Sequence, residues 1–243
     1  AFNRPTLWHT PSNTSCLLPL SHPVQAPIMS SIRVRYQTIE FGEIDIHIRT
    51  LRDNQQFSDP EGIAENLGIN SALWPLFGVV WPSSLVMSHF LLDYNLENKR
   101  ILEIGCGIGL ASILLNHRLA DITATDYHPE VEAFLDINTL LNNDRKIPFV
   151  LADWRSEDNS YSSLGRFDLI FASDVLYEDD HALLLAKFIQ QLAQPQCKVI
   201  LVDPGRGRQG KFNKQMAGAG FSYIQSKPEN TSFLEQPFGG SIL

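Results

Sequence analysis

The chain contains little cysteine, no long apolar run and no excess of positive charge. Its three cysteines among 243 residues form an odd number at unrelated spacings, which indicates reduced thiols rather than a disulfide framework or a zinc site. No apolar run approaches the length of a membrane span, and the most apolar stretch, 72–80, is interrupted by Pro75. The formal net charge of −8 argues against sequence-independent nucleic-acid binding, which needs a positive surface.

The sequence also lacks the features of a secretion signal. Residues 1–30 have no basic n-region and no sustained apolar h-region, and prolines are spread among Ser, Thr and His. We interpret them as an extended or disordered arm before a single domain at 31–243, and we expect a cytoplasmic protein. The sequence does not begin with Met, and one hypothesis is that Met29 is the natural start.

The hydrophobic pattern predicts an α/β fold with a β-hairpin before it. Apolar residues alternate over 32–50 around Gly42, which favours the hairpin, and short helices are expected to begin at Asp59 and Trp81. Strands are then expected near 101–104, 121–126, 147–151, 168–173 and 198–203, helices near 109–119, 129–142, 179–193 and 208–218, and a last antiparallel pair near 221–226 and 240–243. Alternating strands and helices are typical of a parallel sheet covered on both faces, with ligands bound outside the carboxyl ends of the strands.

A glycine motif follows the first of these parallel strands. Gly105, Gly107 and Gly109 lie between residues 101–104 and a helical pattern, so they predict a tight turn where a ligand approaches the backbone. Asp126 ends the next strand, 17 positions after Gly109, where it is placed to accept hydrogen bonds from a ribose diol. The alternative for Asp126 is a helix N-cap.

The motif departs from the dinucleotide fingerprint. The third glycine of G-x-G-x-x-G would fall at position 110, which is leucine, and no P-loop Gly-Lys-Ser/Thr is present. Glu103 precedes the first glycine by two residues, where a carboxylate would repel a pyrophosphate but suits a cationic amino group. Cys106 lies inside the turn, where a small side chain is required, and we favour packing over a nucleophilic role.

This pattern resembles motif I of the seven-β-strand S-adenosylmethionine (SAM) methyltransferases. The resemblance implies a Rossmann-like, doubly wound, mostly parallel seven-stranded sheet with helices on both faces, and SAM as the cofactor. Asp126 matches the family's ribose-binding position, Tyr127 would cover the adenosine, and Asp153 matches the acid that accepts the adenine amino group. Asp153 could instead be a surface acid. Trp154 and Ser173, each next to one of the matched strand ends, complete the expected cofactor site.

Two further segments resemble the small protein-lysine methyltransferases within this group. Asp174-Val-Leu-Tyr177 matches the D-x-x-Y motif beside the incoming amine, which makes Asp174 and Tyr177 the expected catalytic residues. Trp81 stands in the segment before motif I, at the cofactor pocket of that group. With Asp203-Pro-Gly-Arg206, these segments look most like the branch that methylates the electron-transfer flavoprotein β subunit. Capping by Asp174 and packing by Tyr177 and Trp81 are the alternatives.

The expected fifth strand is followed by cations in an otherwise acidic chain. Arg206, Arg208 and Lys211 could dock an acidic protein surface, or they could belong to a solvated loop and helix. Arg206 could also pair with Asp203 or Asp174. The expected reaction is methyl transfer to a lysine of a specific protein, without a metal. The alternatives are an N-methyltransferase for a nicotinamide-like or amine substrate, and a non-catalytic SAM-binding regulatory module.

Overall fold

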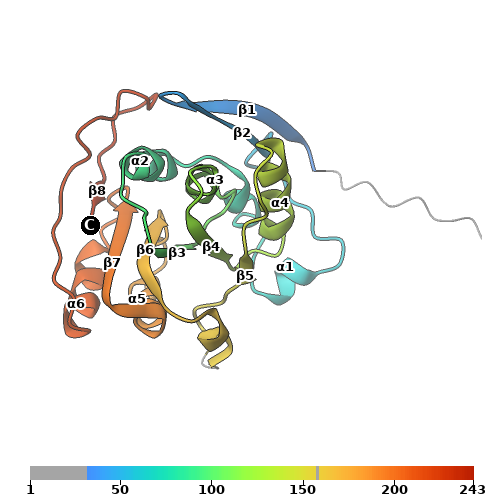
Figure 1. The fold of residues 1–243 in the computed structure, drawn as a ribbon. Helices are drawn as coiled ribbons and strands as arrows, with labels where there is room; N and C mark the ends of the chain where they lie inside the picture. Colours follow the sequence, from blue (N-terminus) through green and yellow to red (C-terminus); the bar gives the residue numbers. More distant parts are fainter. Residues whose placement is uncertain (1–31, 157–158) are drawn as a thin grey trace, which may run out of the picture. The chain divides into compact units, whose positions relative to one another are not determined.

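A computed structural model describes residues 32–156 and 159–243, so the expected arm at 1–30 lies outside the described residues. The central sheet has the strand order β5-β4-β3-β6-β7-β8 and is parallel except for β8 (Figure 1). Its strands are β3 (Arg100–Ile104), β4 (Asp121–Asp126), β5 (Phe149–Leu151), β6 (Phe167–Ser173), β7 (Ala193–Asp203) and β8 (Ser241–Ile242). The α/β class and the parallel sheet are confirmed.

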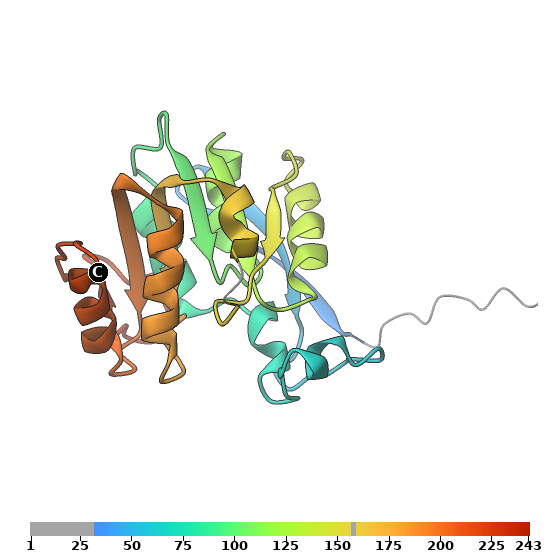
Figure 2. The ribbon, with the colours of Figure 1, turned by 90° about the horizontal axis from the view of Figure 1, so that it is seen from below.

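Helices cover both faces of this sheet (Figure 2). One core contains α2 (Pro82–Leu91), α3 (Leu110–His117) and α4 (Val131–Leu141); the other contains α5 (His181–Leu192), α6 (Gln209–Gly218) and part of η2 (Asn159–Leu164). Successive strand residues alternate between the two cores, as Ile101 and Leu102 do on β3. The chain runs from β3 to β4 on one side and later to β6 on the other, which creates a switch point at the carboxyl end of β3.

The predicted hairpin forms a separate two-stranded sheet. Strands β1 (Val34–Phe41) and β2 (Ile44–Leu51) pair antiparallel, with Gly42 in the turn at a φ of 65°. The side chain of Asn138 on α4 accepts from the backbone N–H of Arg49 at 2.6 Å and donates to its carbonyl at 3.2 Å. Asn142 does the same with the backbone of His47, at 2.9 and 2.8 Å. These two amides fasten the hairpin to α4.

The segment between the hairpin and β3 leads the chain to the carboxyl end of the sheet. The helix expected from Asp59 is the short α1 (Ile63–Asn66), and the Asp59 carboxylate accepts from the Glu65 N–H at 2.8 Å. The 3₁₀ helix η1 (Trp74–Gly78) follows, and α2 begins at Pro82 directly after Trp81, as predicted. No helix in the described parts of the chain is long and apolar enough to cross a membrane.

Two details of the sequence prediction are wrong. The sheet has six described strands rather than seven, because residues 221–226 form no strand and only Ser226 bridges to Ile242. The last strand is correspondingly short. Strand β7 begins at Ala193 rather than 198, because Ala193 already pairs with Phe167 across an irregular register. The Gln194-Pro195 segment gives a turn signal that the neighbouring strand overrides.

Candidate active site

The glycine turn between β3 and α3 has the backbone that only glycine adopts readily. Gly105, Gly107 and Gly109 have φ angles of 67°, 54° and 76°. A Cβ atom on Gly107 would lie 2.9 Å from the carbonyl oxygen of Phe77 on η1, and one on Gly105 would lie 2.7 Å from Val175. Only residues without a Cβ fit here, because the turn packs tightly against its neighbours. The N–H groups of Cys106 and Gly109 donate to the carbonyls of Thr125 and Cys106, at 3.0 and 2.9 Å.

Asp126 joins the end of β4 to this turn. Its carboxylate accepts from the N–H of Gly107 at 2.8 Å, of Tyr127 at 2.8 Å and of His128 at 2.9 Å. Burial raises the pKa of Asp126, and these three hydrogen bonds oppose the rise. The carboxylate retains acceptor capacity for a ribose hydroxyl. It does not cap α4, whose N-cap residue is Glu130.

Glu103 is a residue of β3, and its side chain reaches the first turn of α3. It is buried, and its Oε2 accepts from both the N–H and the hydroxyl of Ser112. Burial raises the pKa of Glu103 to about 8; the bonds from Ser112 oppose this, and the charge of Asp126 adds to it. A cationic group close to Glu103 would favour its ionised form.

Cys106 is buried within the turn, as its small size led us to expect. Burial raises the pKa of its thiol, and the charges of Asp126 and Glu103 raise it further. A thiol that resists ionisation is a poor nucleophile, so the environment of Cys106 supports the packing role.

Arg155 contacts both Tyr127 and Asp153, although the sequence analysis did not select it. The guanidinium of Arg155 stands 5.0 Å from the ring centroid of Tyr127, and its Nε is 3.0 Å from Asp153 Oδ1. Tyr127 donates its hydroxyl to the carbonyl of Leu67, which also accepts from Arg155 at 3.3 Å. Arg155 is two residues from Asp153, but its contact with Tyr127 depends on the fold and has no local signal.

Trp154, Tyr177 and His181 form an aromatic group beside the turn. The His181 ring lies 5.4 Å from Trp154 and 4.6 Å from Tyr177, both edge-on. A Cβ on Gly105 would lie 3.9 Å from Trp154. His181 Nδ1 donates to the carbonyl of Val175 at 2.8 Å, which fixes the ring. We missed His181 because it begins a helix in a run of acids that looks like ordinary N-terminal charge.

Tyr177 is 41% exposed, so part of the residue is reachable from solvent. Desolvation raises its pKa to about 12, and the charges of Asp126 and Asp174 are among the further causes. Tyr177 is therefore a protonated phenol at neutral pH, and it lies close enough to both acids to be affected by them.

Asp174 follows β6 in a left-handed conformation, with a φ of 56° that few non-glycine residues adopt. Its carboxylate is 8% exposed and receives two hydrogen bonds from Arg206, Nε to Oδ1 at 2.8 Å and Nη2 to Oδ2 at 3.1 Å. Of the two partners suggested for Arg206, the structure selects Asp174. Asp203 is buried and accepts instead from the N–H groups of Gly205 and Arg206 and from Gln209.

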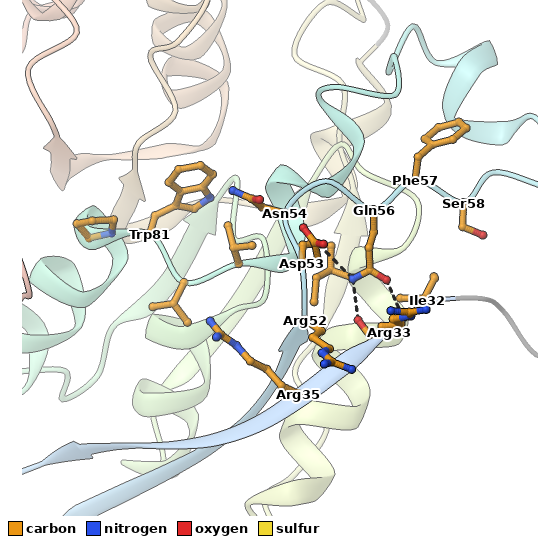
Figure 3. A pocket seen from close by; sticks show the side chains of 14 residues that line it. Ile32, Arg33, Arg35, Arg52, Asp53, Asn54, Gln56, Phe57, Ser58 and Trp81 are labelled. Carbon is orange, nitrogen blue, oxygen red and sulfur yellow. Dashed lines mark hydrogen bonds between the residues drawn. The ribbon is translucent and has the colours of Figure 1, made fainter.

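Ser173 lies beside the turn, because its neighbour Ala172 pairs with Ile104, the residue before Gly105. Ser173 is the last residue of β6 and pairs with Val202. The indole of Trp81 donates to the carbonyl of Leu76 at 2.9 Å and lines a cavity beside the hairpin (Figure 3). Arg208 pairs with Asp179 at 3.2 Å. Thus the turn, Asp126, Trp154, Asp174 and Tyr177 gather at the switch point, whereas Trp81 lines a separate cavity.

The structure also contains one group that the sequence did not suggest. Among the described residues, Glu178, Asp180 and His181 could each offer a metal ligand within 4.8 Å of one another. Glu178 already pairs with His181 at 3.4 Å, and both acids are exposed, as such groups commonly are without an ion.

Solved structures with a similar fold include methyltransferases. A ribosomal protein L11 methylase from Lactobacillus delbrueckii subsp. bulgaricus superposes with a TM-score of 0.55 at 15% identity, over 85% of this chain and 97% of that one. The magnesium protoporphyrin IX methyltransferase of Synechocystis PCC 6803, solved with bound SAM, has a TM-score of 0.51 at 17% identity, over 79% and 86%. At such identities the likeness concerns the fold, which is that of the class I SAM-dependent methyltransferases.

Sequence comparison narrows this class to one family. The sequence profile described as lysine methyltransferase matches residues 70–217, more than half of the chain. The chain therefore belongs to the lysine methyltransferase family. Similar proteins include the protein-lysine methyltransferase METTL21E of Bos taurus, 39% identical over 45% of this chain and 41% of its own length. Another is the electron transfer flavoprotein beta subunit lysine methyltransferase of Xenopus laevis, 29% identical over 56% of each. The chain spans about half the length of these curated relatives.

Proposed function

We propose that this protein is a SAM-dependent N-methyltransferase that modifies a lysine side chain of a specific protein. The observation that carries the proposal is the position of Asp174 and Tyr177, which flank the switch point beside the glycine turn and Asp126. Membership of the lysine methyltransferase family supports the reaction, and relatives named as protein-lysine methyltransferases support a protein substrate.

The residues at the turn fit SAM. The Asp126 carboxylate, held beside the glycine turn by the N–H of Gly107, suits a nucleoside with a ribose diol, and Glu103 suits the cationic amino group of the methionine part. Tyr127 and Trp154 would cover the adenosine, with Asp153 toward its amino group; Ser173 and Trp81 stay predictions for the same site. SAM, when bound, supplies a methyl group that is already electrophilic because it is carried on a sulfonium.

The chain's own task is to present a neutral amine in line with that methyl group. A lysine has a reference pKa of ~10.4, so it must lose a proton before it can react. The Asp174 carboxylate would accept a hydrogen bond from the amine and orient its lone pair, and the Tyr177 phenol would form the wall and a second acceptor. Arg206 already shares the charge of Asp174, which weakens the tendency of that carboxylate to hold the lysine as an ammonium ion.

We also propose that Arg206, Arg208 and Lys211 contribute to docking of the protein substrate. Two of these cations are paired within the chain, Arg206 with Asp174 and Arg208 with Asp179. Arg206 is thus better suited to positioning Asp174, and Lys211 is the member most available to a partner. A cytoplasmic location also stays a prediction.

The test uses methyl-labelled SAM in a lysate that lacks this activity. We choose Asp174→Asn rather than alanine, because asparagine tolerates the left-handed backbone at this position. Wild type should label a discrete, nuclease-resistant protein band, and the variant should lose about 100-fold or more of the rate, as expected when a positioned catalytic group is removed. SAM binding should be nearly unchanged. Asp121→Ala, an exposed acid at the opposite end of the sheet, is the control.

Each other outcome contradicts a different part of the proposal. Loss of SAM binding in Asp174→Asn would place Asp174 in the cofactor site. Label found only among small molecules would indicate an amine or heterocycle substrate. SAM binding without transfer to any fraction would favour a regulatory SAM-binding module.

A further inference from the structure

A cavity of about 750 Å³ opens between the hairpin, the loop after β2 and the start of α2 (Figure 3). Its walls differ in character. Arg33, Arg35 and Arg52 lie on one side, and Phe57, Val80 and Trp81 provide apolar surface. We call it the arginine groove. Its volume lies within the range of ~300–1,000 Å³ typical of ligand-binding clefts.

The groove is positive in a chain whose formal net charge is −8. Asp53 is the one acidic residue that lines it against three arginines. Within the described parts of the chain, the guanidinium groups of Arg33 and Arg52 have no hydrogen-bond or ion-pair partner, and that of Arg35 donates only to Thr50, at 3.3 Å. Three neighbouring cations repel one another, so an anionic ligand would lower their electrostatic energy.

Hydrogen bonds to the backbone of Arg33 and Arg52 fix the walls of the groove, and the arginine side chains take no part in them. The side chain of Gln56 accepts from the N–H of Arg33 at 2.5 Å and donates to the carbonyl of Arg33 at 2.8 Å (Figure 3). The N–H of Arg52 donates to the same carbonyl at 2.8 Å. The loop after β2 is thereby fixed to the start of the hairpin, and the arginine side chains are left to contact a ligand. Preformed walls reduce the entropy lost on binding.

The apolar side of the groove indicates more than a simple anion. Phe57 is 47% exposed, a large fraction for an aromatic side chain. The Trp81 ring is only partly buried although its N–H is bonded. Aromatic and arginine side chains together are typical of the residues that carry most of the binding energy at protein interfaces.

The groove is linked to the glycine turn through one short segment. Leu51, which lines the groove, packs so closely on Gly78 that a Cβ there would lie 2.3 Å from the leucine side chain. The neighbouring Phe77 carbonyl lies against Gly107. A partner held in the groove would therefore sit beside the segment that supports the cofactor turn.

We propose that the arginine groove binds an acidic segment, with at least one bulky apolar residue, of the protein that is methylated. This inference rests on the proposed function for the identity of the partner, but not for the binding itself. The chain's own N-terminal segment is a poor occupant, because residues 1–31 contain no Asp or Glu. A long nucleic acid is disfavoured by the net charge of the chain.

The first experiment measures binding without catalysis. A fluorescein-labelled octapeptide, Glu-Asp-Phe-Glu-Glu-Leu-Asp-Glu, is titrated with the full chain by fluorescence anisotropy, beside a peptide in which lysine replaces every acid. Wild type should bind only the acidic peptide, and Arg33→Glu and Arg52→Glu should each weaken binding by about tenfold or more, because a favourable charge becomes a repulsive one. Lys187→Glu, the same charge change at an exposed position on α5, should bind as wild type does.

The second experiment separates this inference from the proposed function. With labelled SAM in the lysate, Arg52→Glu should lower kcat/KM for the labelled protein about tenfold while SAM binding stays unchanged. Equal transfer by wild type and Arg52→Glu would overturn the docking role, as would absent or equal peptide binding in the first experiment. Peptide binding with no transfer by wild type would instead refute the proposed function. If wild type binds a labelled single-stranded oligonucleotide rather than the acidic peptide, and Arg52→Glu loses that binding, the partner would be a nucleic acid and the proposal would be wrong.

Discussion

At the scale of single residues, Glu103 shows how one buried acid can connect stability with ligand binding. Its carboxylate bonds the first turn of α3, and burial raises its pKa to about 8 from a reference value of 4.5. Between these two values the folded protein holds a proton that the unfolded chain has released. The contribution of protonated Glu103 to the free energy of unfolding is therefore fully present below its pKa in the unfolded chain, 4.5, and is lost as the pH rises through its pKa in the folded chain, about 8.

Glu103→Gln tests this directly. The amide keeps an acceptor for Ser112 but has no charge to lose, so the free energy of unfolding should decline less between pH 5 and pH 8 than in wild type. The wild-type slope from this group is at most about 1.4 kcal/mol per pH unit. Urea unfolding across that range measures it. Parallel pH profiles of wild type and variant would show that Glu103 is ionised in the folded chain. If the amino group of SAM lies near Glu103, adding SAM should make the pH dependence of the free energy of unfolding of wild type more like that of Glu103→Gln, because a nearby cation favours the carboxylate.

The sequence predicted which candidate residues lie close together where each of them follows a strand directly. Gly105, Asp126 and Asp174 come from three strand ends, and parallel strands bring such ends to one edge. The sequence failed where a contact depends on packing between distant segments. The contact of Arg155 with the Tyr127 ring and the fit of Phe77 against Gly107 have no local pattern in the sequence.

At the scale of elements, the hairpin depends on α4 for its position. Its two strands pair only with each other, and Asn138 and Asn142 bond the outer backbone of β2 from the helix. Asn138 is fully buried and also donates to the carbonyl of Ile108 beside the glycine turn, at 3.2 Å. One amide thus fixes the hairpin, α4 and the turn relative to one another.

Asn138→Ala should therefore destabilise the fold more than Asn142→Ala does. Removing the buried amide leaves the Arg49 N–H without its acceptor, and such losses cost about 1–3 kcal/mol for each unsatisfied group. Asn142 bonds at the exposed end of the hairpin, where water can replace it. Thermal unfolding of both variants gives the comparison. Equal losses would mean that the two amides contribute equally and that burial does not distinguish them.

Element prediction was most reliable where periodicity was strong. The hairpin, α2 and the alternating units from β3 to α6 lie where the pattern placed them, except that β7 begins five residues early. At the end of the sheet, β8 lies within the predicted range 240–243, but it pairs with β7 and the partner strand expected at 221–226 does not form. Residues 221–226 have an apolar alternation that the fold leaves largely exposed.

At the scale of the whole molecule, charge is distributed unevenly. The chain has 27 acidic and 19 basic residues, yet three arginines gather in the arginine groove beside the segment that supports the cofactor turn. The groove cations are exposed and form no ion pair in the described ranges, whereas the acids of the turn, Glu103 and Asp126, are shielded by the fold. Salt screens exposed charges over a Debye length of ~10 Å at 0.1 M and ~3 Å at 1 M, and it affects buried ones much less.

Substrate recognition and cofactor binding should therefore respond differently to salt. Raising the ionic strength from about 0.05 to 0.5 M should lower kcat/KM for the protein substrate by about tenfold or more, since steering between exposed opposite charges is screened. The dissociation constant of SAM should change far less over the same range. Methyl transfer at limiting substrate and equilibrium binding of SAM, measured in the same buffers, give the two dependences. A kcat/KM that does not change with ionic strength would mean that the substrate is recognised by shape and apolar contact, and that the arginines of the groove do not contribute.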